Sequence, residues 1–151
     1  MNFTDTNWLA GMYFRGSRHA ETVERYMRSH SSNLVVSPVV VLEARNVFSR
    51  ESGESIPEAW KNFEADGRFY RDPMNWDLLR REVFALISRY GTKESLGTFD
   101  LAIVASARLA GATRMLSFDG QVAALALAEG MEIFPDLNAE GKKTFAKITS
   151  R

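Results

Sequence analysis

Four acidic residues occupy positions in this chain where their carboxylates could act together on a cation: Asp5, Glu43, Asp100 and Asp119. Asp5 and Asp119 each follow a short strand-like run, whereas Asp100 stands at the head of a run with the length and alanine content of a helix. In an open α/β sheet, the carboxyl ends of the strands and the N-termini of nearby helices face one crevice, which is the usual ligand site. The pattern therefore favours a shared cation site.

Glu43 lies on a predicted helix over residues 39–50, where its neighbours three and four residues away are three valines and Asn46. A carboxylate on such a largely apolar stripe needs a partner, because an unpaired buried charge is costly. The partner could be a metal ion or an arginine from elsewhere in the chain.

The other acids also have local interpretations. Asp100 could favour the positive end of its own helix, an interaction worth about 0.3–1 kcal/mol. Asp119 could cap the helix that follows it. Both interpretations remain open at the level of single residues, so the case for a common site depends on all four acids together.

The composition restricts the chemistry of such a site. The 151 residues include 19 Lys and Arg, 19 Asp and Glu, two His and no Cys, which excludes thiol catalysis and cysteine-based zinc sites. Two carboxylates about 5 Å apart repel by roughly 3 kcal/mol at an effective dielectric near 20, so four in one crevice would not all ionise without cations. Oxygen ligands favour Mg²⁺ or Mn²⁺ over zinc.

The same composition bears on partners and location. Zero formal net charge excludes binding to nucleic acid by overall charge alone. The N-terminal residues carry no basic and apolar leader pattern, and no apolar stretch approaches the roughly 18 residues of a membrane span. We therefore expect a soluble cytoplasmic protein with no membrane partner.

The elements that must position the acids alternate between short strands and longer helices. This order predicts one α/β domain with a small parallel sheet flanked by helices. The polar segment 136–151 could be a docked helix or a frayed tail. Strands are predicted at residues 2–4, 34–37, 114–118 and 131–134, and helices at 8–14, 18–29, 39–50, 57–66, 75–90, 98–110 (with Thr98 as N-cap) and 121–129.

Taken in order, these features resemble the PIN domain family. The resemblance covers roughly residues 2 to 135 and implies a three-layer sandwich with a nuclease domain at 1–135 and a C-terminal tail at 136–151. It is carried by Asp5-Thr6-Asn7 after the first strand, Ser37-Pro38 with Glu43 on the next helix, Phe99-Asp100-Leu101-Ala102-Ile103-Val104-Ala105, and Leu116-Ser117-Phe118-Asp119 before a final helix and a strand ending at Pro135.

The resemblance implies a metal-dependent endoribonuclease that uses Mg²⁺ or Mn²⁺, because known members of the family are mostly such enzymes. Members of this size are often the toxins of toxin–antitoxin pairs, which implies an RNA substrate, a small antitoxin partner and a homodimer. Carried over by position, it marks Asp5, Glu43, Asp100 and Asp119 as the catalytic and metal-binding acids. Asn7 and Ser117 would be supporting polar groups.

Three other functions compete with this one. The chain could be a PIN-like module that binds RNA or a partner without cleaving, or a 5′-nuclease acting on DNA. It could also be a phosphotransferase using Asp5 as nucleophile, similar to haloacid dehalogenase-like proteins, although the later lysine and acidic pair of that family have no counterpart here. We expect His19, on a polar helix, and His30, in a loop, to be solvated and not catalytic.

Overall fold

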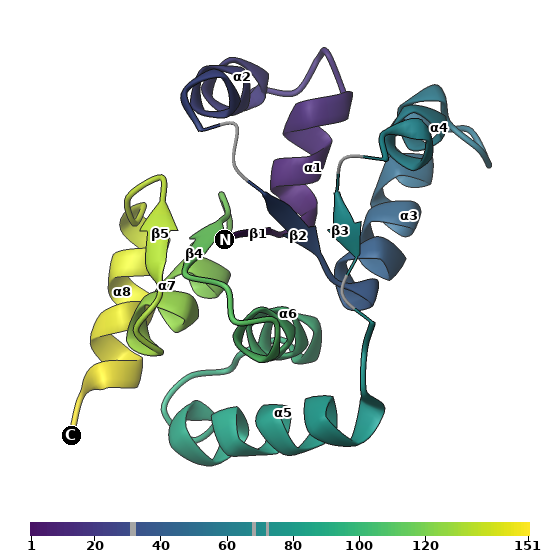
Figure 1. The fold of residues 1–151 in the computed structure, drawn as a ribbon. Helices are drawn as coiled ribbons and strands as arrows, with labels where there is room; N and C mark the ends of the chain where they lie inside the picture. The colour runs from purple at the N-terminus through teal and green to yellow at the C-terminus, as the bar shows by residue number, and fades with distance from the viewer. Residues whose placement is uncertain (31–32, 68, 72) are drawn as a thin grey trace.

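The computed structural model describes residues 1–30, 33–67, 69–71 and 73–151 and has an α/β architecture (Figure 1). Its strands are β1 (Asn2–Thr4), β2 (Leu34–Val36), β3 (Tyr70–Arg71), β4 (Arg114–Leu116) and β5 (Glu132–Phe134). Its helices are α1 (Thr6–Tyr13), α2 (Ala20–Ser29), α3 (Pro38–Ser52), α4 (Glu58–Ala65), α5 (Trp76–Tyr90), α6 (Thr98–Leu109), α7 (Gly120–Ala128) and α8 (Ala139–Thr149).

The strands form one parallel sheet in the order β3-β2-β1-β4-β5. From β1, the strands β2 and β3 are added in chain order on one side of the sheet, and β4 and β5 are then added on the other side of β1. Open sheets hold ligands beyond the carboxyl ends of their strands where the direction of building reverses. In this protein the reversal lies between β1 and β4, which are neighbours in the centre of the sheet.

Helices flank the sheet on both sides, as the sequence predicts (Figure 1). The helix α1 packs against α2, α3 and α4, α5 packs on α6, and α7 packs on α8 beside β4 and β5. Phe3 of β1, Met115 of β4 and Trp8 of α1 are fully buried in the core. Among the described residues, no helix combines the length and hydropathy that crossing a membrane requires.

Two local predictions are wrong. The sequence predicts no strand at 70–71, but β3 pairs there with β2. It also predicts Thr98 as the N-cap of α6, whereas Gly97 holds that position with an extended backbone and Thr98 is already helical. The side chain of Asp100 lies close to this cap, since a Cβ atom added to Gly97 would lie 3.3 Å from Asp100 Oδ2.

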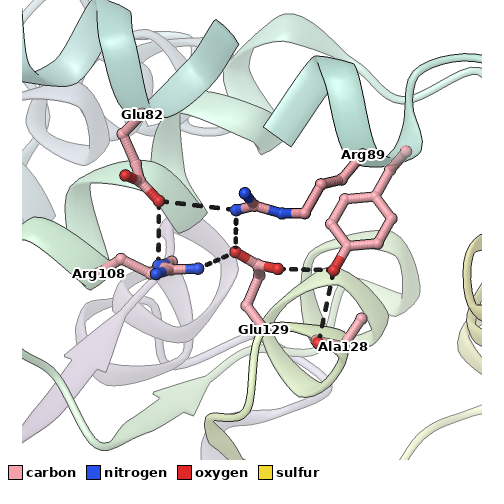
Figure 2. A network of polar contacts seen from close by, with 6 residues as sticks. Glu82, Arg89, Arg108, Ala128 and Glu129 are labelled. Atoms are coloured by element: carbon pink, nitrogen blue, oxygen red, sulfur yellow. Dashed lines mark hydrogen bonds and ion pairs between the residues drawn. The ribbon is translucent and has the colours of Figure 1, made fainter. Parts of the chain in front are cut away.

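A polar network joins α5, α6 and α7 (Figure 2). It lies at the C-terminal ends of α6 and α7, whereas Asp100 and Asp119 lie at their N-terminal ends. Glu129, the C-cap residue of α7, accepts from Arg89 of α5 at 2.5 Å, from the Tyr90 hydroxyl at 2.6 Å, and from Arg108 of α6. Arg108 also lies 3.0 Å from Glu82 of α5. The side chain of Glu129 is only 5% exposed, so this network fixes how α6 and α7 lie against each other.

Residues 136–151, for which the sequence allows either a docked helix or a frayed tail, contain the helix α8. Its N-terminal turn lies against that of α7, where glycines allow close approach. A Cβ on Gly120 would lie 2.7 Å from the backbone nitrogen of Gly141, and one on Gly141 would lie 3.1 Å from the carbonyl oxygen of Gly120. This contact brings the first turn of α8, with Glu140, next to the helix headed by Asp119.

Candidate active site

Asp5 is the most enclosed of the four predicted acids. It follows β1 directly, is 3% exposed, and caps α1 by accepting from the backbone N–H of Trp8 at 3.0 Å. Its second carboxylate oxygen accepts from the hydroxyl of Ser117, which follows β4. Each carboxylate oxygen therefore has a donor, and the orientation of the carboxylate is fixed by two neighbouring strands.

Asp119 heads α7 at the same edge of the sheet. Its Oδ1 accepts from the backbone N–H groups of Gln121 at 2.9 Å and Val122 at 3.1 Å, which confirms its predicted role as a helix cap. Because both bonds end on Oδ1, Oδ2 is the oxygen that remains for a ligand among the described contacts. A capping role and a site role are thus compatible in this residue.

Asp100 and Glu43 come from the flanking helices and are both half-buried. Asp100 lies in the first turn of α6, and Glu43 lies in the second turn of α3. The two helices are tied together by the hydroxyls of Ser37, the N-cap of α3, and Ser106 of α6, which are hydrogen-bonded at 3.1 Å and buried. This bond holds the helix of Glu43 against the helix of Asp100.

The charges of Asp119 and Glu43 act on both Asp5 and Asp100. Burial raises the pKa of Asp5 to about 7, the bonds from Ser117 and Trp8 oppose this rise, and the charges of Asp119 and Glu43 add to it. Burial likewise raises the pKa of Asp100 to about 6, with further increases from Asp119, Glu43 and Glu140. Repulsion among carboxylates therefore reaches all four residues singled out from the sequence.

Glu140 is an acid that sequence reasoning missed. It is exposed in the first turn of α8, and its charge acts on Asp100 because α8 approaches α7 closely at Gly120 and Gly141. No local pattern marks it, since its place depends on a contact between two helices. A glycine at the start of each helix is the one sequence signal that could have suggested this contact.

The donors of the site fit a hard divalent cation better than a soft one, because every candidate ligand is a carboxylate oxygen. Burial is the main cause of the raised pKa of Asp5 and Asp100, and a cation would relieve the smaller contribution from carboxylate repulsion. Among the described residues, however, no three acidic or histidine side chains converge closely enough to form a ready-made metal cage.

The other predicted site residues occupy different surroundings. Ser117 is buried and bonded to Asp5, while Asn7 is exposed in the first turn of α1. The expectation that both histidines are solvated holds for His30, which is exposed, whereas His19 is half-buried. The ring of His19 stacks on Phe118 with centroids 3.8 Å apart, and that of His30 stacks on Tyr26 at 4.0 Å.

Comparison with protein-family models matches residues 3–134 to the PIN domain. The chain belongs to the PIN domain family. The matched range contains all four acids and, apart from the first residue of β1, all the strands of the described sheet. A comparison with curated proteins found no match.

Solved structures of the same fold come from several bacteria. VapC20 of Mycobacterium tuberculosis, a sarcin–ricin loop cleaving toxin, is 20% identical with a TM-score of 0.70, over 87% of this PIN domain protein and 96% of that chain. FitAcB of Neisseria gonorrhoeae is 17% identical, with a TM-score of 0.62 over 89% and 96% of the two chains. A toxin–antitoxin complex of Klebsiella pneumoniae is 17% identical, with a TM-score of 0.60 over 93% and 98%. At these identities the similarity shows the fold.

Proposed function

We propose that this PIN domain protein is a metal-dependent endoribonuclease and the toxin of a toxin–antitoxin pair. The observation that carries the proposal is the hydrogen bond from Ser117 to Asp5, which joins the carboxyl ends of β1 and β4 two residues before Asp119, together with the action of the Asp119 and Glu43 charges on both Asp5 and Asp100. Burial first, and then repulsion from Asp119 and Glu43, raise the pKa of Asp5 and Asp100, and such shifted carboxyls support a site for positive charge. The family and its structural neighbours support the choice of a nuclease.

Asp5, Asp100 and Glu43 would hold Mg²⁺ or Mn²⁺, and Asp119 would hold a second ion or orient a water. A divalent cation at this place supplies positive charge against the phosphate and makes water more acidic. Asp5 must be ionised to take part, and the donors Ser117 and Trp8 favour that form. Asp119 keeps a fixed direction because its Oδ1 is bonded twice to the head of α7.

The proposed partners are an antitoxin and a second copy of the chain. Two of the structural neighbours were solved as complexes, one with a DNA fragment and one described as a toxin–antitoxin complex. The exposed face of α5 carries large apolar side chains, with Trp76 66% and Phe84 58% exposed. Exposed apolar area of this kind supports a protein interface. A homodimer and a small basic antitoxin segment are the occupants we propose.

Cleavage of fluorescent single-stranded RNA tests the function. We expect cleavage with Mg²⁺ or Mn²⁺ and none with EDTA. Asp100→Asn and Asp119→Asn should each lower the rate at least about 100-fold, as expected when a group that stabilises transition-state charge is lost. Asp77→Asn, at an exposed acid on α5, is the matched control. Cleavage of single-stranded DNA in place of RNA would favour the 5′-nuclease alternative, and binding without cleavage would favour the binding module.

A further inference from the structure

A hollow of about 360 Å³ opens beside the acidic site. Two of its lining residues are close in sequence to the site residues: Asn7 lies two residues after Asp5, and Phe118 lies between Ser117 and Asp119. Its volume lies within the roughly 300–1,000 Å³ of pockets that hold small ligands. The lining residues used below are Asn7, Ser17, Arg18, His19, Glu51 and Phe118.

One wall of this pocket is a set of nearly parallel rings. Phe118 stacks on the fully buried Trp8 at 5.3 Å and 13°, and on His19 at 3.8 Å and 5°. The buried indole anchors the set, and the half-buried imidazole is its outer member. Another flat ring could extend the set by stacking on His19.

The polar groups of the pocket hold His19 in place. The Nε of Arg18 donates to Nε2 of His19 at 3.2 Å, and the backbone N–H of His19 donates to the Ser17 hydroxyl at 3.2 Å. Burial and the Arg18 charge both lower the pKa of His19. The imidazole is therefore presented as a neutral ring beside an exposed guanidinium.

We propose that this pocket receives one nucleotide of a single-stranded RNA next to the bond that is cut. The base would stack on His19, and Arg18 would bind a phosphate. Glu51 and Asn7 would contact the edge of the base. The inference rests on the proposed ribonuclease function and adds to it a site for a flanking nucleotide.

The combination of groups favours a nucleotide over a peptide side chain. Proteins that read single-stranded RNA stack splayed bases on aromatic rings and bond their edges with polar side chains. Arginine suits the phosphate because its planar fork of donors matches the phosphate oxygens. A helix or strand of a partner protein would instead be expected to meet a longer and more apolar groove.

Glu51 gives the pocket a preference among bases. An ionised carboxylate only accepts hydrogen bonds, and guanine offers it two adjacent donors, its ring N–H and its exocyclic amino group. Adenine and cytosine place a ring acceptor beside the amino group, and uracil has a single ring N–H between two carbonyl oxygens. The pocket should therefore bind guanosine nucleotides most tightly.

The first test measures binding without cleavage. The 151-residue protein in EDTA would be titrated with each nucleoside 5′-monophosphate and followed by NMR at the backbone amides and the His19 ring. We expect shifts at Ser17, His19 and Phe118, with the guanosine nucleotide bound most tightly. Saturating additions that leave these residues unshifted, or equal binding of all four nucleotides, would overturn the inference.

Variants assign the roles of the two charged residues. Arg18→Ala should weaken every nucleotide about tenfold, since a charge-assisted phosphate contact is lost. Glu51→Gln should weaken guanosine binding to the level of the other nucleotides, because an amide keeps only one acceptor oxygen for the two guanine donors. Arg15→Ala is the control, because Arg15 is exposed nearby but lines the separate hollow between α1 and α2. If Arg18→Ala behaves like Arg15→Ala, the proposed phosphate contact is wrong.

The readouts separate this inference from the proposed function. Failure of the ribonuclease proposal would appear as absence of metal-dependent cleavage by the wild-type protein. Failure of the pocket would appear in a protein that cleaves RNA but whose Arg18→Ala and Glu51→Gln variants bind nucleotides and cut RNA as the wild type does. An effect of these variants on antitoxin binding alone would show that the pocket belongs to a protein interface and would also overturn the inference.

Discussion

Replacing Asp100 with asparagine should stabilise the metal-free protein above neutral pH. The folded protein raises the pKa of Asp100 from 3.8 to about 6, chiefly by burial and then by the charges of Asp119, Glu43 and Glu140. Two pKa units correspond to roughly 3 kcal/mol, and we count about half because Asp100 is only half-buried and solvent screens its charge. The expected gain is therefore about 1–2 kcal/mol.

The pH dependence follows from the sign of this shift. A carboxyl with a raised pKa contributes stability below its unfolded-state pKa and loses it as the pH rises through its folded-state pKa. The advantage of Asp100→Asn should thus be full at about pH 8, decline below about pH 6 and vanish near pH 4. For a protein of this size, the gain corresponds to a melting temperature about 3–6 °C higher.

Thermal unfolding followed by circular dichroism in EDTA provides the measurement. Adding Mg²⁺ or Mn²⁺ should raise the melting temperature of the wild type more than that of the variant, since a ligand bound only by the native state stabilises it. Ca²⁺ and Na⁺ at equal ionic strength control for screening. A variant that melts lower than the wild type at about pH 8, or whose difference does not change with pH, would refute the reasoning.

Two further predictions concern the residues that support the acids. Ser117→Ala removes the hydroxyl that favours ionised Asp5, so the acidic limb of the pH–rate profile for RNA cleavage should move to higher pH. Ser117→Thr keeps a hydroxyl, and its profile should stay near that of the wild type. An unchanged profile for Ser117→Ala would contradict this role. Glu129→Gln should lower the stability measured in urea by about 2 kcal/mol, because it breaks a network that buries Glu129 but leaves Arg89 and Arg108 partly solvated. The control Glu132→Gln, at a 67% exposed carboxylate, should cost about 0.5 kcal/mol or less, and equal losses would show that the network is not special.

The sequence supports the fold well wherever structure depends on neighbouring residues. Asp5 and Asp119 precede helices and accept from their first N–H groups, which is a local property of the chain. The placement of Asp100 was also predictable, although the cap was not. Gly97 stands in place of Thr98 as N-cap, and the Asp100 side chain lies beside it, a contact that depends on the rotamer of Asp100.

Features that depend on distant contacts could not be predicted. The strand β3 has two residues, too few to show any periodicity, and exists through its pairing with β2. His19 lies in a polar segment, yet its ring finds Phe118, about a hundred residues away. Glu140 reaches the site because Gly120 and Gly141 let two helices touch. In each case the missing information was tertiary and not a matter of propensity.

The order of strands in the sheet also has a consequence for synthesis on the ribosome. The central strand β1 and Asp5 are made early, but their neighbour β4 and Asp119 are encoded more than 100 residues later. At about 5–20 residues per second, roughly 6–20 s separate the translation of these two acids. During that interval the nascent chain holds only part of the acidic site. Helices α1 to α4 emerge within it, so a partner that binds them could engage the chain before the site is complete.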